Sequence, residues 1–241
     1  MDLSIIVPAY NEEKRITNFL SELSLFGKNN LKDYEIVIVD DGSTDNTREV
    51  IKDFIKRDKK IRLVSYPKNK GKGYAIREGI FSSNGNKIIF IDADGSIRPD
   101  QIPLMLKELE QYDCVVGNRR DKDSQVTTSK YRDFTQRLFN SIVMILFNSK
   151  INDNLCGFKG FKKEVALDLF NELHDYGWIF DVEIFYKIQK KGYSLKRIPI
   201  VWKHVGDSKM KPLDPVWMFI KLLKILQYRI PTLFEKNDKN R

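Results

Sequence analysis

The sequence contains little cysteine and histidine. Two cysteines and two histidines occur among 241 residues. Neither Cys114 nor Cys156 has a second cysteine or a histidine nearby at the spacing of a metal site. This composition argues against a disulfide-stabilised scaffold and favours a reducing compartment.

Long apolar runs are absent as well. A membrane-spanning helix needs about 18 or more consecutive apolar residues. The longest candidates are Ile142 to Phe147, which is too short, and Val216 to Ile230, which lysines and an arginine interrupt. The amino terminus lacks a signal-peptide pattern and leads directly into an apolar segment. We therefore expect a cytoplasmic protein that is not integral to a membrane.

Two common nucleotide-binding motifs are missing. No GxGxxG follows the first apolar segment, and no GxxxxGK[ST] occurs. Their absence disfavours a dinucleotide-dependent enzyme and a P-loop NTPase.

Positive charge is in excess and is unevenly placed. The formal net charge is +9. From Lys203 to the end, nine Lys and Arg face four Asp and Glu, and from Arg119 to Arg137 six face three. This bias suits an anionic partner such as a phosphate, a membrane surface or a nucleic acid, although solvated helix faces explain part of it.

Short apolar segments alternate with segments of helical periodicity in the first hundred residues. We expect strands at Leu3 to Val7, Glu35 to Val39, Ile61 to Ser65 and Ile88 to Ile91, and a fifth at Cys114 to Gly117. We expect Asn11 to cap the first helix and Gly27 to end it. This order predicts an α/β fold with a mostly parallel sheet, helices on both faces, and ligands at the carboxyl ends of the strands.

Polar clusters follow the first four predicted strands. They are Pro8 to Glu12, Asp40 to Ser43, Asn69 to Gly73 and Asp92 to Asp94. Taken singly, each has an ordinary explanation as a cap, a turn or a flexible loop. Together they predict one site at one edge of the sheet.

The residue types in these clusters suit a nucleoside diphosphate. Asp40 can accept a hydrogen bond from a base, Tyr10 offers a ring, and Lys72 offers a cation for a phosphate. Asp92 and Asp94 directly follow a buried strand, where two carboxylates are costly unless a cation pairs with them. They therefore form either a divalent metal site or, considered alone, a surface turn.

The ordered motifs VPAYNE, VDDGSTDNT, NKGKGYAIREG and DADGS closely resemble family 2 glycosyltransferases of the GT-A fold. VVGNRR, LCGFKGF, WIFDVEIF and HVGDSK extend the similarity to roughly residues 3 to 230. These later segments look most like the dolichyl-phosphate glucosyl branch and, more loosely, the mannosyl branch. The resemblance implies one Rossmann-like domain over 1–230, with a nucleotide-sugar-binding half at 1–118 and an acceptor half with amphipathic helices at 119–230. A polar tail would occupy 231–241.

The resemblance also implies a donor site and a metal. Asp94 and Asp92 would be the DxD pair that holds Mg²⁺ or Mn²⁺. Ser96 stands where mannosyl enzymes have a glutamine ligand, which favours a glucosyl donor such as UDP-glucose and leaves the third metal ligand open. The residues implied to hold the nucleotide sugar are Pro8, Ala9, Tyr10, Glu12, Asp40, Asp41, Lys72, Gly73, Asp92, Ala93, Lys203, Ser208 and Lys209.

The implied reaction is inverting transfer of a hexose to a polyprenyl phosphate such as dolichyl phosphate. The residues implied to hold the acceptor phosphate are Arg119, Arg132, Arg137 and Ser141. Asp92, Asp94, Arg119 and Arg137 would act in catalysis. Asp181, with Glu183, would serve as a base only if the acceptor were a sugar hydroxyl, and otherwise would position the sugar or a loop. We expect His204 to be structural.

Two apolar helical stripes lie beside basic residues. They are Ile142, Ile145 and Leu146, and later Trp217, Ile220, Leu223 and Leu226. Such stripes pack in a core or rest on a membrane, and we expect peripheral contact at the cytoplasmic face. Transfer to a saccharide hydroxyl and a non-catalytic nucleotide-binding subunit are the alternative functions. A nucleic-acid partner is disfavoured, and the sequence does not specify an oligomeric state.

Overall fold

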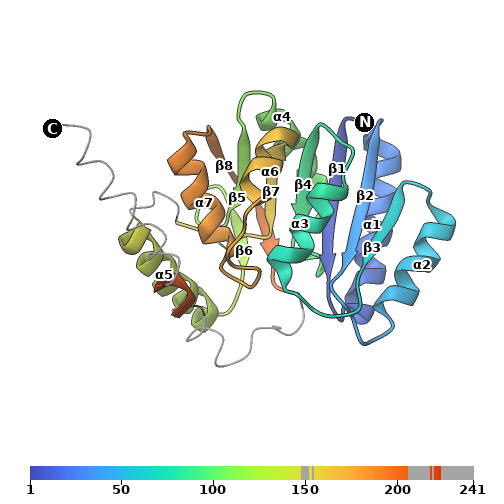
Figure 1. Ribbon diagram of the computed structural model, residues 1–241, viewed down its shortest axis with the longest axis horizontal. Coiled ribbons are helices and arrows are strands. Elements are labelled where there is room, and N and C mark those ends of the chain that lie inside the picture. Colours follow the sequence, from blue (N-terminus) through green and yellow to red (C-terminus); the bar gives the residue numbers. More distant parts are fainter. Residues whose placement is uncertain (148–151, 154, 206–217, 219, 224–241) are drawn as a thin grey trace.

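The computed structural model describes residues 1–147, 152–153, 155–205, 218 and 220–223. Its main element is a seven-stranded sheet in the order β3-β2-β1-β4-β7-β5-β8 (Figure 1). The strands of this sheet are β1 (Leu3–Ala9), β2 (Tyr34–Asp40), β3 (Ile61–Ser65), β4 (Lys87–Ile91), β5 (Cys114–Asn118), β7 (Phe158–Lys162) and β8 (Leu195–Pro199).

Helices cover both faces of the sheet. On one face, side chains of α1, α2 and α4 pack in a buried cluster with Ile5, Val7, Ile36 and Ile38. On the other face, α3, α6 and α7 pack against Ile6, Val37 and Phe90. The helices are α1 (Glu13–Asn30), α2 (Thr47–Arg57), α3 (Lys72–Ser82), α4 (Ile102–Leu109), α5 (Lys130–Phe147), α6 (Lys163–Phe170) and α7 (Phe180–Lys191), with a short 3₁₀ helix at Pro99–Gln101.

The first hundred residues fold as the predicted alternation of strands and helices, and β1 to β4 are mutually parallel. The second half of the chain contributes β7, which pairs antiparallel with both β4 and β5. The sheet is thus mostly parallel, and a late strand lies inside it, between β4 and β5. Each of the strands β1, β2 and β4 is almost wholly buried because both of its faces are covered.

Two local predictions for the first helix are wrong. Helix α1 continues past Gly27 to Asn30, and the Leu31 amide donates to the Gly27 carbonyl. Gly27 is instead a packing position, since a Cβ there would lie 2.7 Å from the Tyr34 ring. Asn11 does not cap the helix. It adopts a left-handed conformation with φ 51°, and its side-chain oxygen accepts from the Thr44 amide.

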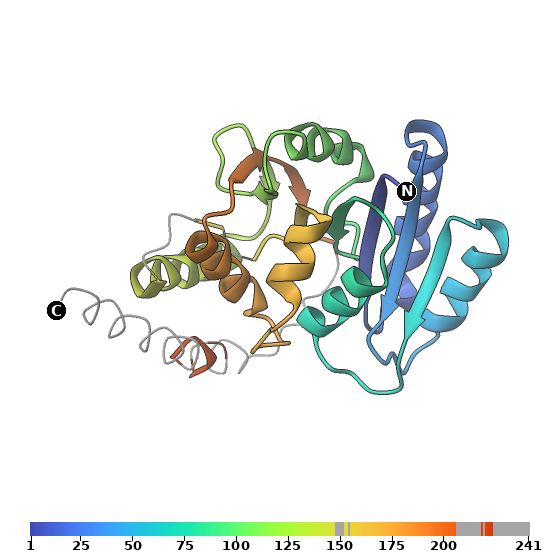
Figure 2. The ribbon, with the colours of Figure 1, turned by 45° about the horizontal axis from the view of Figure 1, so that its top comes forward.

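A second, smaller sheet accompanies the main one. Strands β6 (Gln125–Thr127) and β9 (Val201–Lys203) form a two-stranded parallel sheet. Helix α5 lies near α7, away from β1 to β3 (Figure 2). Val143 and Phe147 of α5 pack in a separate buried cluster with Ile179, Val182, Met218 and Leu222. Among the helices that the structure describes, none is both long and apolar enough to cross a bilayer.

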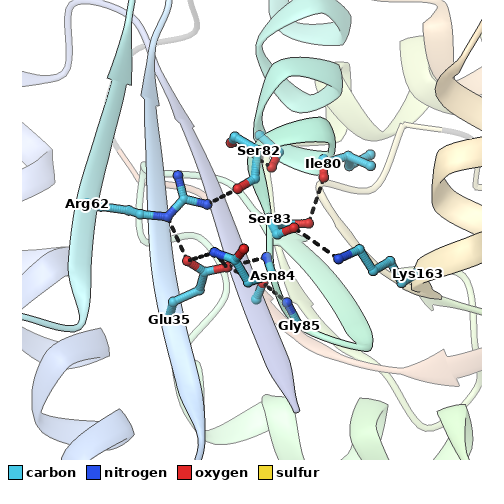
Figure 3. Close-up of polar contacts among 10 residues, drawn as sticks. Glu35, Arg62, Ile80, Ser82, Ser83, Asn84, Gly85 and Lys163 are labelled. Atoms are coloured by element: carbon cyan, nitrogen blue, oxygen red, sulfur yellow. Dashed lines mark hydrogen bonds and ion pairs between the residues drawn. The ribbon is translucent and has the colours of Figure 1, made fainter. Parts of the chain in front are cut away.

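A buried carboxylate organises the amino-terminal edge of the parallel strands. Glu35 accepts hydrogen bonds from the Ser4 hydroxyl at 2.6 Å, from the Asn84 amide at 2.7 Å and from Arg62 Nε at 2.6 Å (Figure 3). Arg62 also donates to the Ser82 carbonyl. This network ties β1, β2, β3 and the turn before β4 together at the edge opposite the polar clusters.

Candidate active site

A cavity of about 790 Å³ lies at the carboxyl edge of the strands. Its wall contains residues from all four predicted polar clusters. The predicted donor-site residues on the wall are Pro8, Ala9, Tyr10, Glu12, Asp41, Lys72, Asp92, Ala93 and Asp94. The structure therefore brings most of the predicted donor residues together at one edge of the sheet.

Asp92 is fixed between a lysine and a glycine. Lys72 Nζ lies 2.6 Å from Asp92 Oδ1. On its other side, Asp92 packs so closely on Gly157 that a Cβ there would lie 1.9 Å from Oδ2. The Asp92 amide also donates to the Gly157 carbonyl at 3.1 Å. Asp92 consequently has little freedom to change its orientation.

Asp94 is partly buried in the turn that follows β4. Its Oδ1 accepts from the Ser96 amide at 2.9 Å, and Gly95 between them has φ +73°. Burial and the neighbouring Asp92 carboxylate raise the pKa of Asp94. A carboxylate in this position is stabilised in its charged form by an added cation.

This donor set fits a hard divalent cation. Two carboxylates lie beside the cationic side chain of Lys72, and carboxylate oxygens are the ligands that Mg²⁺ and Mn²⁺ prefer. In the described residues, no three acidic, histidine or cysteine side chains form a cluster sufficient to hold a metal. Water and substrate oxygens commonly complete the coordination of Mg²⁺ in phosphate-binding sites.

Asp40 is wholly buried and lies outside the cavity wall. Its Oδ2 accepts from Arg48 Nε at 2.8 Å, and its Oδ1 accepts from the Ser43 amide. In this structure the Asp40 carboxylate holds the turn after β2, and its role toward a base stays a prediction.

Asp41 lies on the wall and holds the loop after β3. Its carboxylate accepts from the amides of Lys70 and Gly71 and from the side chain of Asn69. Burial raises the pKa of Asp41, and these hydrogen bonds only partly offset the effect. Asp41 therefore shapes the donor cavity from its own loop.

Gly73 is a packing position at the start of α3. A Cβ there would lie 2.9 Å from the Cβ of Phe180, and the Gly73 amide donates to the Tyr176 carbonyl. Gly73 lies outside the cavity wall. Its absent side chain allows α3 to approach α7 closely.

The predicted acceptor residues are placed less uniformly. Arg119 is buried, and both Nε and Nη2 donate to Asp153 at 2.9 Å and 2.6 Å. Arg137 is largely exposed, with Nε 2.8 Å from Asp133 Oδ2. Ser141 lies on the same helix and is exposed. The side chain of Arg132 lies outside the described part of the chain.

Asp181 is buried, does not line the cavity, and pairs with Lys159 at 2.8 Å. Burial raises its pKa, and Lys159 and Lys72 counteract this effect. Glu183 is also buried and accepts from the His174 and Asp175 amides. Both carboxylates therefore face the interior in this structure.

Lys203 is exposed on β9, and its amide donates to the Ser96 carbonyl. His204 lines the cavity and stacks on Trp202, with ring centroids 6.0 Å apart. Ser208 and Lys209 lie outside the described residues.

Several residues on the wall were missed by the sequence reasoning. Arg15 pairs with Glu12 at 2.7 Å, and Trp178 and Trp202 add aromatic surface. Arg15 lies at i+3 from Glu12, which was an available signal. Trp178 and Trp202 come from distant segments, so only the tertiary fold places them beside the nucleotide-type motifs.

The family 2 glycosyl transferase model matches residues 4–170. This chain belongs to glycosyltransferase family 2. The family predicted from the ordered motifs is thereby confirmed.

Relatives with assigned names match almost the whole chain. Dolichyl-phosphate beta-glucosyltransferase of Homo sapiens is 36% identical over 94% of this chain and 74% of its own length. The enzyme of the same name from Saccharomyces cerevisiae is 31% identical over 98% of this chain and 78% of its own. The Trichomonas vaginalis ALG5C enzyme is 33% identical over 98% and 74%, respectively.

Solved structures share the fold. Glucosyl-3-phosphoglycerate synthase from Mycobacterium tuberculosis in complex with UDP has a TM-score of 0.66 at 19% identity, covering 89% of this chain and 74% of its own. A complex of that enzyme with Mn²⁺, UDP and glucosyl-3-phosphoglycerate has a TM-score of 0.64. These similarities confirm the GT-A fold predicted for this family 2 member.

Proposed function

We propose that this chain is a metal-dependent, inverting glucosyltransferase that moves glucose from UDP-glucose to dolichyl phosphate or a similar polyprenyl phosphate. The observation that carries the proposal is the 31–36% identity to dolichyl-phosphate beta-glucosyltransferases over nearly the whole chain. The cavity supports it because its acidic pair and its lysine suit a nucleoside diphosphate bound with a divalent ion.

The donor would occupy the cavity between the β1 and β2 loops and the DxD turn. Tyr10 offers a partly exposed ring on the cavity wall, and Lys72 offers an ammonium group beside Asp92. Asp94 and Asp92 would hold Mg²⁺ or Mn²⁺. The bound ion would supply charge stabilisation to the departing diphosphate.

The attacking group in this proposal is an acceptor phosphate oxygen. A phosphate monoester has a second pKa of about 6 and is largely ionised at neutral pH. The nucleophile therefore needs orientation rather than deprotonation. Asp181, buried and paired with Lys159, is not required as a base in this scheme.

The acceptor phosphate would lie near the two arginines that share Asp133. Arg137 pairs with Asp133 Oδ2, and Arg120 pairs with Oδ1 of the same carboxylate. Two guanidinium groups around one carboxylate leave one positive charge in excess, which an incoming phosphate can neutralise. Arg119 Nε and Nη2 already donate to Asp153, so this edge of the guanidinium would shape the region and would not contact the phosphate.

The lipid part of the acceptor would reach the site along α5. Phe134, Leu138 and Ile145 are exposed at 64%, 53% and 80% on this helix. Spacings of four and seven residues place them on one helical face. Ile142 and Leu146, predicted as part of the membrane face, instead pack against the buried cluster between α5 and α7. We propose that the Phe134, Leu138 and Ile145 face rests on a membrane at its cytoplasmic side.

The proposal is tested with purified protein, UDP-glucose, a short polyprenyl phosphate and Mn²⁺ or Mg²⁺. We expect a lipid-linked hexose, detected by mass spectrometry, with β configuration at the anomeric carbon by NMR. GDP-mannose in place of UDP-glucose should give much less product. Transfer to added saccharides without lipid-linked product would contradict the proposed acceptor.

A further inference from the structure

Lys159 is a charged residue on an interior strand of the sheet. It lies on β7 opposite Phe90 of β4, and its side chain has no exposed surface. The ammonium lies 5.3 Å from the ring centroids of Phe90 and Phe185. A buried lysine costs several kcal/mol unless it is well paired, so its position calls for a physical explanation.

The partner of Lys159 is Asp181 in the first turn of α7. Lys159 Nζ lies 2.8 Å from Asp181 Oδ1 and also donates to the Cys156 carbonyl at 2.6 Å. Cys156 directly precedes Gly157, the residue on which Asp92 packs. The buried pair therefore lies directly behind the DxD turn and outside the cavity.

Close packing of two helices brings Asp181 toward the cavity lysine. Gly73 at the start of α3 approaches Phe180 at the start of α7. Lys72 and Asp181 are the chain neighbours of these two residues. Burial lowers the pKa of Lys72, but the carboxylates of Asp92 and Asp181 outweigh burial and raise it. Lys72 Nζ lies 2.6 Å from Asp92 Oδ1.

We propose that Lys159 and Asp181 are positioning residues, which hold Lys72 against Asp92 and thereby set the orientation of the DxD carboxylates for the donor. The inference rests on the donor site proposed above. Charges alternate from the core to the cavity in the order Lys159, Asp181, Lys72, Asp92. Asp94 adds one further negative charge, which leaves this set one charge negative before a divalent ion binds.

The arrangement assigns Asp181 a role other than general base. A base must reach the proton that it removes, within about 3.2 Å or through one water. Asp181 is absent from the cavity wall, and its Oδ1 faces Lys159. Its removal should therefore weaken binding of the donor and the ion as well as slow turnover.

The experiment uses calorimetric binding of UDP in the presence of Mn²⁺, a measurement independent of lipid transfer. The main variant is the double change Lys159→Met with Asp181→Asn, which removes both buried charges at nearly constant volume. Replacement of a buried pair by neutral groups often preserves stability. We expect a thermal midpoint close to that of the wild type and UDP–Mn²⁺ affinity reduced about tenfold, the size of one lost charged contact.

Lys72→Met completes a cycle. Alone it should reduce affinity by a larger factor, because Lys72 also offers its ammonium group to the donor. Added to the double variant it should cause a smaller loss than it causes in the wild type, because both changes remove the same constraint on Asp92. Lys162→Met is the matched control: Lys162 lies on the same strand but pairs with Asp113 at the opposite edge. This control should leave the affinity unchanged.

The outcomes separate the two proposals. Wild-type protein that binds neither UDP nor Mn²⁺ would contradict the proposed donor site itself. The positioning role would be overturned if the wild type bound UDP–Mn²⁺ and the double variant bound it with the same affinity. It would also be overturned if the loss of affinity in the triple variant equalled the product of the losses in the double variant and in Lys72→Met. A Lys159→Met and Asp181→Asn variant with normal affinity and turnover reduced more than about a thousandfold would instead indicate a base.

Discussion

The guanidinium of Arg119 and the carboxylate of Asp153 form a two-point ion pair in the protein interior. Arg119 Nη2 lies 2.6 Å from Asp153 Oδ1, Arg119 Nε lies 2.9 Å from Oδ2, and the Arg119 amide also donates to Oδ2. The side chains are only 7% and 2% exposed. This geometry joins the end of β5 to the segment that precedes β7.

We expect Asp153→Asn to reduce the free energy of unfolding by about 3 to 5 kcal/mol, because it leaves a buried guanidinium without its counter-charge. Urea unfolding at neutral pH measures this loss. Arg137→Gln, which removes a largely exposed charge, should cost less than about 1 kcal/mol. Normal stability of Asp153→Asn together with a higher KM for the acceptor would favour a direct phosphate role for Arg119.

The Glu35 network predicts a loss of stability in acid. Burial tends to raise the pKa of Glu35, but hydrogen bonds from Arg62, Ser4 and Asn84 outweigh it, so the pKa is lowered in the folded state. Its contribution to stability is therefore present above the unfolded pKa of about 4.3 and is lost as the pH falls through the lower folded value.

Glu35→Gln should reduce the free energy of unfolding at pH 7 by about 1 to 3 kcal/mol, since a charged acceptor of several buried donors is lost. Chemical unfolding between pH 3 and pH 7 tests this. The variant should also lose less stability than the wild type between pH 5 and pH 3. Parallel curves for the two proteins would argue against the lowered pKa.

Gly157 provides a steric test of the DxD geometry. Gly157→Ala should displace Asp92, because the new Cβ would lie 1.9 Å from its Oδ2. A displacement of about 1 Å at a catalytic group can cost about a hundredfold in rate. Initial-rate assays of sugar transfer measure the effect.

Gly160→Ala is the matched comparison on the same strand. Its Cβ would meet the side chains of Met105 and Leu109 at 2.8 to 2.9 Å, far from the cavity. We expect it to lower the thermal midpoint and to change turnover much less than Gly157→Ala does. Equal effects of the two variants on turnover would refute a special role for the Asp92 contact.

The proposed role of Asp94 as a metal ligand predicts that sugar transfer depends on a divalent ion. Chelation with EDTA should abolish transfer, and Mn²⁺ or Mg²⁺ should restore it. Asp94→Asn should reduce turnover by about a hundredfold or more, because it removes one of the two carboxylates that would hold the ion. Its thermal midpoint without metal should rise or stay unchanged, since burial and the Asp92 carboxylate disfavour the charged form of Asp94 and raise its pKa. Full turnover of Asp94→Asn would contradict the metal role.

The exposed face of α5 predicts binding to vesicles. Changing Phe134, Leu138 and Ile145 together to serine should reduce co-sedimentation with anionic vesicles by about tenfold or more, because each buried apolar side chain contributes about 1.5 to 3 kcal/mol. UDP binding should be unaffected. Leu25→Ser, which removes a 63% exposed leucine on α1, is the control and should leave vesicle binding unchanged.

The sequence predicted most of the first half of the structure. Local patterns determine β1 to β4 and the helices between them, because apolar periodicity and strand-end polar clusters are short-range signals. Local predictions were wrong where tertiary contacts determine the conformation of a residue. The Asn11 side chain accepts a hydrogen bond from the loop after β2 and does not cap the helix that it precedes. Gly27 packs on Tyr34, and α1 continues past it.

The residues of the candidate site show the same contrast between short-range patterns and tertiary contacts. Asp92, Asp94 and Lys72 were predicted from strand ends and lie together on the cavity wall. The pairing of Arg119 with Asp153 and of Asp181 with Lys159 was not predicted, since each joins segments more than 20 residues apart without a local pattern. Among charged residues, sequence alone identified which ones gather at the edge of the sheet but not which ones neutralise one another.

The insertion of β7 between β4 and β5 has a consequence for how the chain acquires its structure. Residues 87–91 find their second neighbour only after about 70 further residues have been synthesised. Until then β4 is an open, apolar edge, the kind of surface that pairs with other chains. A fragment ending near residue 118 should consequently aggregate, and the full chain should fold slowly because this pairing is long-range. Strand β7, which carries Lys159 behind the DxD turn, is thus also the strand that joins β4 to β5 in the sheet.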